Sequence, residues 1–342
     1  MMKKRVTIKD VAAQAGVTYQ TVSKVITRRA QVLPETEARI WAATESLGYR
    51  PNHNARNLRA QRSHMIGYSW VPTRRDQANH ILDVFLSSMV EEAEAAGYHL
   101  LPFPYREAAD QVSAYRELID SGRVDGFVLS SVNYADPRVT FLLENQCPFV
   151  AFGRCEPEAS FPFVDIDGRA GLRMATESLL RQGHRRIAAL GWPEASRVGN
   201  DRLSGYFEAM HAAEATIEPA WVARGEGTFE FGLATTHAWL DLPMAARPTG
   251  VVALNDTMAI GAMHAAQSRG ALPGRQFSVI GFDDSPMAQY LWPPLSSVRQ
   301  PIRLAGRKCV EMLVAILGGQ PLADTQTLLL PELIVRESSG AA

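Results

Sequence analysis

Residues 6–25 read VTIKDVAAQAGVTYQTVSKV, and this stretch decides the architecture of the N-terminal part of the chain. Its first half places apolar residues at the spacing of one helix face, namely Ile8, Val11, Ala12 and Ala15. Thr7 precedes that helix as a candidate N-cap, Gly16 interrupts the pattern, and Thr18 is placed to cap a second helix. Two short helices joined by a turn that contains glycine predict a helix-turn-helix.

A third amphipathic helix is predicted from Pro34 to Gly48, which completes a small all-α head. The outward side of the second helix carries four polar residues, Tyr19, Gln20, Ser23 and Lys24. Side chains of these types are able to bond the edges of bases in the major groove of DNA. We therefore interpret this helix face as a reader of DNA sequence.

Charge is unevenly distributed along the chain of 342 residues. Residues 1–62 hold twelve Lys or Arg and four Asp or Glu, a net charge of +8, whereas the other 280 residues carry −9. A basic head on an acidic body favours a polyanion such as double-stranded DNA as the partner of the head.

Beyond residue 63, short apolar runs alternate with amphipathic stretches. The runs predict strands over 65–71, 98–103, 126–129, 149–152, 186–191, 250–254 and 277–282, and the amphipathic stretches predict helices over 80–96, 108–121, 168–182, 203–213, 255–269 and 302–317. This alternation predicts an α/β body of two doubly wound parallel-sheet subdomains, with a break near residue 160. Such sheets bind ligands at the carboxyl ends of their strands, so we expect a ligand site between the two subdomains.

Residues 6–25, together with LGYRPNHNARNL at residues 47–58, resemble the DNA-binding head of the lactose-repressor (LacI-type) family. The resemblance implies a helix-turn-helix domain over 1–50 and a hinge over 51–63 that becomes helical on DNA. In the family a leucine of this hinge wedges into the minor groove, and Leu58 matches it. The predicted DNA contacts are Thr7, Thr18, Tyr19, Gln20, Ser23, Lys24, Arg28, Asn52, Ala55, Arg56 and Leu58. Lys24 replaces an arginine of the member that names the family, so the operator sequence does not carry over.

Four stretches of the body resemble the family's effector domain, which is like a periplasmic sugar-binding protein and would span residues 64–342. They are RLSGY at 202–206, NDTMAIGAM at 255–263, SVIGFDD at 278–284 and PPLSSVRQ at 293–300. The resemblance implies that the chain crosses back between the subdomains near 290 and 322, and that Arg202, Asn255 and Asp283 bond the effector. A guanidinium, an amide and a carboxylate suit a ligand with many hydroxyls, such as a sugar.

Two positions depart from the family pattern. Gly153 stands where many members carry an acidic contact, so Arg154 is a substitute candidate, and the Phe-Gly-Arg variant resembles members that sense glucosides. Gly227 stands where an aromatic side chain often stacks on the ligand. The candidate replacements for that aromatic face are Trp70, Phe229 and Trp292.

Enzyme, metal and membrane functions find no support in the sequence. The chain has no G-x-G-x-x-G, P-loop or G-x-S-x-G motif, and the stretch from Asp165 lacks the glycine and glutamate of a calcium loop. We therefore predict no enzyme activity and no cofactor. No apolar run reaches the length of a spanning helix and no signal peptide is evident, so we expect a cytoplasmic protein that does not enter a membrane.

The resemblance implies a homodimeric transcriptional repressor of carbohydrate-utilisation genes. It would bind a pseudo-palindromic operator and be released by a small sugar inducer, with a glucoside among the candidates. Two alternatives stay open on the sequence alone: a regulator of the same family that needs its ligand as co-repressor, and a cytoplasmic sugar-binding protein.

Overall fold

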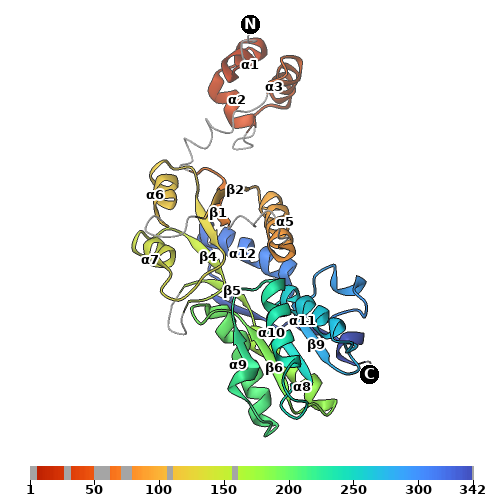
Figure 1. Cartoon of the computed structure of the whole chain (residues 1–342). Coiled ribbons are helices and arrows are strands. Elements are labelled where there is room, and N and C mark those ends of the chain that lie inside the picture. Colours follow the sequence, from red (N-terminus) through yellow and green to blue (C-terminus); the bar gives the residue numbers. More distant parts are fainter. Residues whose placement is uncertain are drawn as a thin grey trace. The chain divides into compact units, whose positions relative to one another are not determined.

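The computed structural model describes residues 6–26, 32–49, 62–70, 79–105, 111–155 and 161–340. The chain divides into two compact units, the head at Met1–Ser63 and the body at His64–Ala342 (Figure 1). In the described residues, no helix combines the length and apolar character needed to span a membrane.

The described residues of the head form three helices, α1 (Ile8–Ala15), α2 (Tyr19–Ile26) and α3 (Pro34–Ser46). Their apolar faces meet in a small core of seven buried residues, Val11, Ala12, Ala15, Val22, Val25, Ile40 and Ala43. The Asp10 carboxylate accepts hydrogen bonds from the Thr7 backbone N–H at 2.8 Å and from the Thr7 hydroxyl at 2.7 Å, which fixes the start of α1. The predicted helix-turn-helix is confirmed.

The turn between α1 and α2 depends on Gly16. Its φ of 64° lies in the left-handed region, which ends α1. The Val17 N–H donates to the Ala12 carbonyl oxygen at 3.0 Å, and Thr18 Oγ1 accepts from the Thr21 N–H at 3.2 Å. The chain therefore leaves one helix and enters the next within three residues, and the exposed side of α2 is held in a defined orientation relative to α1.

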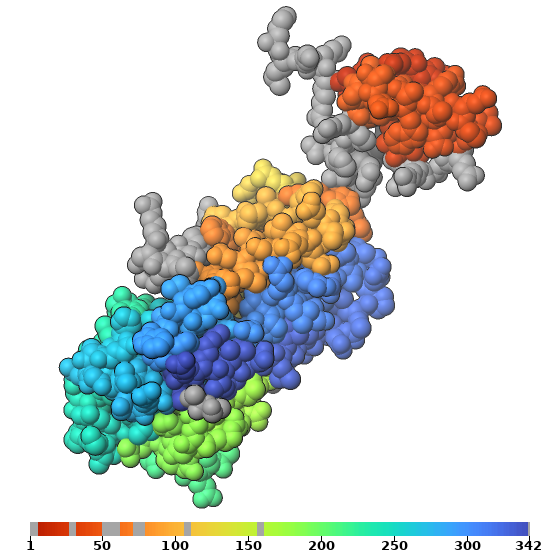
Figure 2. Space-filling view, turned by 90° about the vertical axis from the view of Figure 1, so that its right-hand side faces the viewer, coloured from red at the N-terminus to blue at the C-terminus, as the bar shows by residue number. Residues whose placement is uncertain are grey.

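The N-terminal subdomain of the body is built on a parallel sheet with the order β11-β5-β4-β3-β1-β2. Its strands are β1 (Met65–Trp70), β2 (His99–Pro104), β3 (Gly126–Leu129), β4 (Phe149–Phe152), β5 (Phe163–Ile166) and β11 (Gln326–Leu329). α5 (His80–Ala95) and α12 (Ile302–Leu317) cover one face, and α6 (Ser113–Asp120) and α7 (Pro137–Glu144) cover the other. The adjoining surfaces of α5, in orange, and α12, in blue, are visible in Figure 2.

The C-terminal subdomain repeats this plan with the order β12-β10-β9-β8-β6-β7. Its strands are β6 (Ile187–Gly191), β7 (Val222–Arg224), β8 (Gly250–Ala253), β9 (Ser278–Asp283), β10 (Ser296–Arg299) and β12 (Glu332–Ile334). Its helices are α8 (Gly168–Arg181), α9 (Arg197–Ala212), α10 (Phe229–Leu240) and α11 (Asp256–Ser268). Only the edge strand β12 pairs in the antiparallel direction among the described strands, so the expectation of two α/β parallel sheets is confirmed with this one exception.

The chain passes between the subdomains three times. It crosses between Ile166 and Gly168, between Arg299 and Ile302, and between Leu329 and Glu332. These crossings lie C-terminal to the expected positions 160, 290 and 322. The positions differ because the sequence pattern did not predict β5, β10 and β11. β5 contains the charged residue Asp165 and β10 contains two buried serines, so neither is a purely apolar run, and β11 lies at the edge of its sheet.

Helix pairs in the C-terminal subdomain approach closely at glycines. A Cβ atom added to Gly205 of α9 would overlap the backbone carbonyl of Arg169 in α8. We expect Gly205→Ala to lower the free energy of unfolding by about 1–3 kcal/mol, because the helices must move apart. Urea unfolding would measure this, with Gly191→Ala as the control, because a Cβ there would meet its nearest atoms at ordinary van der Waals distances of 3.4–3.5 Å. Equal stability of Gly205→Ala and the wild type would contradict the close packing.

Candidate functional site

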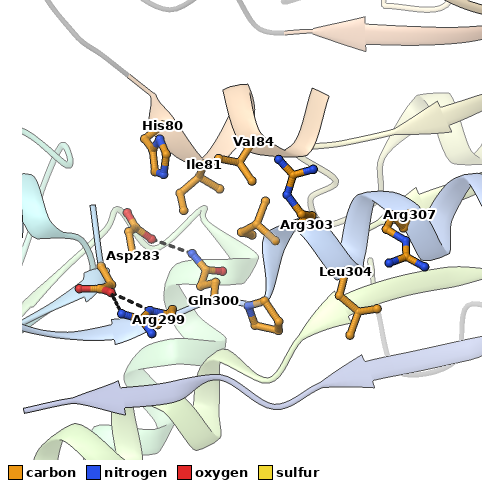
Figure 3. A pocket seen from close by; sticks show the side chains of 12 residues that line it. His80, Ile81, Val84, Asp283, Arg299, Gln300, Arg303, Leu304 and Arg307 are labelled. Carbon is orange, nitrogen blue, oxygen red and sulfur yellow. Dashed lines mark hydrogen bonds and ion pairs between the residues drawn. The ribbon is translucent and has the colours of Figure 1, made fainter. Parts of the chain in front are cut away.

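Two cavities lie where the strands of the body end. The larger has a volume of about 500 Å³ and is bounded by α5 on one side and by the ends of β9 and β10 and the start of α12 on the other. Figure 3 shows His80 and Ile81 of α5 facing Asp283 and Gln300 across this cavity. The smaller, about 370 Å³, is lined by Trp192, Pro193, Ser196, Glu226, Gly227, Thr228 and Asn255.

Arg202 of α9 contacts a lining residue of each cavity, Asp283 of the larger and Trp192 of the smaller. Arg202 is 6% exposed, its guanidinium donates to the Leu254 carbonyl oxygen at 2.6 Å, and it lies 3.7 Å from the carboxylate of Asp283. The guanidinium carbon also lies 4.9 Å from the ring centre of Trp192 and 3.8 Å from that of Phe282. Its Nε is buried and has no hydrogen-bond partner among the described residues. A buried donor without a partner is costly, so this N–H is a candidate donor to a ligand oxygen.

Asp283 lies at the end of β9 with its backbone in a strained conformation, since its φ is 113°. Gln300 donates to its Oδ1 at 2.7 Å, which fixes the carboxylate at the wall of the larger cavity. Burial raises the pKa of Asp283 to about 7, and the nearby Asp256 acts in the same direction, although Arg202 opposes the shift. The carboxyl group is therefore an acceptor or donor for ligand hydroxyls near neutral pH.

Asn255 begins α11 and also lines the smaller cavity. Its Oδ1 accepts from the Met258 N–H at 2.8 Å, and its Nδ2 donates to the Gly227 carbonyl oxygen at 2.9 Å. Asn255 therefore caps a helix and holds a loop, and it has one amide hydrogen left for a ligand. The neighbouring Asp256 is buried and accepts from the Ser297 hydroxyl at 2.5 Å.

Arg154 belongs to a network of ion pairs, part of which crosses between the subdomains. Its Nε donates to Asp165 at 2.9 Å, and its other nitrogen approaches Asp201 of α9 at 3.1 Å. Arg197 of α9 pairs in turn with Asp165 at 2.9 Å. Arg154 lines neither cavity, so its guanidinium is used in holding α9 against the ends of β4 and β5.

The three aromatic candidates lie outside both cavities. Trp70 ends β1 and is 40% exposed, next to residues 71–78, which are outside the described residues. Phe229 begins α10 and packs edge-on against His264 at 5.2 Å. Trp292 is 81% exposed on a loop. The aromatic side chain that does line a cavity is Trp192, which sequence reasoning missed, although it directly follows the predicted strand that ends at Gly191.

The predicted DNA-reading face of the head is accessible. Thr7, Thr18, Gln20 and Lys24 are exposed, Tyr19 is 42% exposed and Ser23 is half-buried. Tyr19, Gln20, Ser23 and Lys24 all belong to α2. Five predicted contacts lie outside the described residues: Arg28, Asn52, Ala55, Arg56 and Leu58. Their roles stay predictions.

The described part of the chain brings together no group of three or more His, Cys, Asp or Glu side chains that could hold a metal ion.

The pH dependence of stability follows from Asp283. In the folded protein its pKa is raised from 3.8 to about 7, so between these values the folded state keeps a proton that the unfolded state has lost. The free energy of unfolding should therefore fall as the pH rises from about 4 to about 7. The groups that face Asp283 are Arg202, Asp256 and Gln300, with His80 across the cavity. Urea unfolding between pH 4 and 8 should show a shallower slope for Asp283→Asn, and an identical slope would contradict the raised pKa.

Comparisons with known proteins cover both units. The family model described as "Bacterial regulatory proteins, lacI family" matches residues 7–52, and the model described as "Periplasmic binding protein-like domain" matches residues 176–339. The chain is similar to the HTH-type transcriptional regulator CelR of Thermobifida fusca, with 32% identity over 98% of this chain and 99% of that protein.

Three solved structures are also similar. A regulatory protein of the LacI family from Chloroflexus aggregans is 61% identical, with a TM-score of 0.79, and the match covers 81% of this chain and 99% of that one. A CelR–cellobiose complex is 31% identical over 98% of this chain and 100% of that one, with a TM-score of 0.74. The lac repressor dimer bound to operator and the anti-inducer ONPF is 26% identical, with a TM-score of 0.85, over 99% of this chain and 100% of that one.

Proposed function

Because the chain belongs to the lacI family of bacterial regulatory proteins, we propose that it is a homodimeric repressor of carbohydrate-utilisation genes that a sugar releases from its operator. The relatives are transcriptional regulators that bind DNA through the same type of head, so the expectation that the chain is not an enzyme is confirmed. The proposed place of action is the cytoplasm.

The observation that carries the sugar-responsive part of the proposal is the arrangement around Arg202. A buried guanidinium with an unpartnered Nε lies beside the carboxylate of Asp283, and Asn255 lines the adjoining cavity. The guanidinium, the carboxylate and the amide are groups that bond the hydroxyls of a sugar. CelR is a relative whose structure contains cellobiose, which supports a glucoside as the effector here.

The proposed mechanism couples the cleft to the head through the relative angle of the two subdomains. A sugar that binds the non-operator conformation more tightly shifts the population toward it, by no more than its difference in affinity for the two conformations. The proposed hinge over 51–63, with Leu58 as minor-groove wedge, would transmit this change to the DNA. In the dimer, two α2 helices would read successive major grooves.

Fluorescence anisotropy tests the proposal directly. The probe is a palindromic duplex from upstream of the gene, titrated with the full chain at several salt concentrations, with and without glucose, cellobiose, maltose and other sugars. We expect tight, specific binding that one sugar reverses. Binding only in the presence of a sugar would establish co-repression instead, and sugar binding without operator binding would establish a sugar-binding protein.

Gln20 is the residue we expect to set the base preference most directly. Its exposed amide on α2 suits a bidentate contact to adenine, which contributes about 1–3 kcal/mol to discrimination. Gln20→Ala should therefore relax the preference at one position of each half-site in a selection from randomised operators. Gln14→Ala, on α1, is the matched control and should return the wild-type consensus. If Gln20→Ala also returned that consensus, Gln20 would not read a base.

A further inference from the structure

We infer that Trp192, together with Gly227, forms the aromatic wall of a second sugar subsite, so that the effector contains at least two sugar rings. The inference rests on the proposed function and assigns the smaller cavity to the second ring. Trp192 then becomes the residue that determines whether the protein responds to an oligosaccharide or to a single sugar.

The indole of Trp192 is held in place while part of it stays available. The ring follows β6, packs partly buried against the core of the C-terminal subdomain and lines the smaller cavity. The Arg202 guanidinium carbon lies 4.9 Å from its centre. No hydrogen bond from its Nε1–H is found among the described residues, which leaves a donor for a ligand. The apolar face of such a ring suits stacking on the face of a sugar, and its N–H suits a hydrogen bond to a sugar hydroxyl.

The absence of a side chain at Gly227 allows the indole of Trp192 to occupy its position. A Cβ atom built on Gly227 would lie 2.8 Å from Trp192 Nε1 and 2.7 Å from Asn255 Nδ2, which are distances that real Cβ atoms do not show. A side chain at position 227 and the indole in its present position therefore exclude each other. The loop after β6 therefore supplies, through Trp192, an aromatic surface that the loop after β7 lacks at Gly227.

Polar groups surround this aromatic wall. Ser196 Oγ accepts from the Gly199 N–H at 3.1 Å, which leaves its hydroxyl hydrogen to donate. Thr228 Oγ1 accepts from the Phe231 N–H at 3.2 Å in the same way, and the side chain of Glu226 is exposed at the rim. An apolar surface with a few fixed polar groups is the usual lining of a small-molecule site.

One residue contacts the linings of both cavities. Arg202 contacts Asp283, which lines the larger cavity, and Trp192, which lines the smaller one. With volumes of about 500 and 370 Å³, each cavity has room for a separate part of a ligand. A ligand with one ring in each cavity would contact both Asp283 and Trp192.

Isothermal titration of the full chain with glucose, cellobiose and maltose tests the inference. We expect at least one disaccharide to bind at least tenfold more tightly than glucose. Trp192→Ala should weaken disaccharide binding at least tenfold while changing glucose binding less than twofold, and Trp192→Phe should recover most of the loss. Gly227→Ala should resemble Trp192→Ala. Trp292→Ala, which removes an indole outside both cavities, is the matched control and should bind like the wild type.

Two results would overturn the inference. The first is a wild-type affinity for glucose equal to that for both disaccharides. The second is an unchanged ratio of disaccharide to glucose affinity in Trp192→Ala, either because neither affinity falls or because both fall equally, and an equal fall would mean that Trp192 acts only by positioning Arg202. Operator release measured in parallel distinguishes failure of the second subsite from failure of the proposed function. If sugars release the operator but the ratio is unaffected, only the second subsite fails, whereas a protein that binds no sugar contradicts both.

Discussion

Asp283→Ala should abolish release of the operator by sugar while leaving operator affinity unchanged. The carboxylate lies at the wall of the larger cavity beside Arg202, and the substitution removes a charged hydrogen-bonding group from the proposed effector site. Hydrogen bonds to charged groups contribute about 1.5–3 kcal/mol, so sugar affinity should fall roughly 10- to 150-fold. The head belongs to a separate compact unit, which is why DNA binding should survive.

Operator anisotropy with and without the releasing sugar measures both properties in one titration. Asp241→Ala is a suitable control, because Asp241 forms an exposed surface pair with Arg269 on the same subdomain. Asp283→Asn keeps the shape of the side chain and should retain part of the response. Release of Asp283→Ala at the wild-type sugar concentration would contradict the placement of Asp283 in the effector site.

Asp165→Ala should be the most destabilising of the charge substitutions, by about 3–5 kcal/mol. Asp165 is buried and accepts from both Arg154 and Arg197, so its removal leaves two guanidinium groups without their shared carboxylate. Asp201→Ala removes a more exposed partner of Arg154 alone and should cost less. Urea unfolding of the two variants compares them, and a loss below about 1 kcal/mol for Asp165→Ala would show that the network contributes little.

The same ion pairs join the two subdomains, and therefore bear on the proposed coupling. Arg154 and Asp165 belong to the N-terminal subdomain, whereas Arg197 and Asp201 belong to α9 of the C-terminal subdomain. A rotation that separates these surfaces must break both pairs, so the network favours the subdomain angle seen here.

The sequence predicts those parts of the fold whose local pattern is strong. The head helices follow from the spacing of Val11 and Val22 and from the turn at Gly16, and the apolar strands β3 and β4 have the predicted bounds. The strand β10 was missed because it contains Ser296 and Ser297, which are buried only through partners distant in the sequence. α7 and α10 were missed as well, and α9 begins at Arg197 rather than at 203 because Ser196 caps it.

In the candidate site, too, the sequence predicts the residues that belong to local motifs and misses those that depend on distant contacts. Arg202, Asn255 and Asp283 were chosen from motifs, and the structure places them around the two cavities. The role of Arg154 depends on Asp201, which is 47 positions away, so no local pattern indicates that pairing. Trp192 ends an apolar run and resembles a core residue in the sequence, and only the neighbouring loop with Gly227 shows that it borders a cavity.

The three chain crossings bear on how the protein is made. Each sheet of the body receives an edge strand from the same late segment, β11 for the N-terminal subdomain and β12 for the C-terminal one. During synthesis, neither sheet is complete until residues 326–334 have left the ribosome, so the earlier strands, from Met65 to Arg299, wait for their edge strands. The edge strands of both sheets are therefore added last, and until then the nascent chain exposes unpaired strand edges, the kind of surface that makes a folding intermediate prone to aggregate.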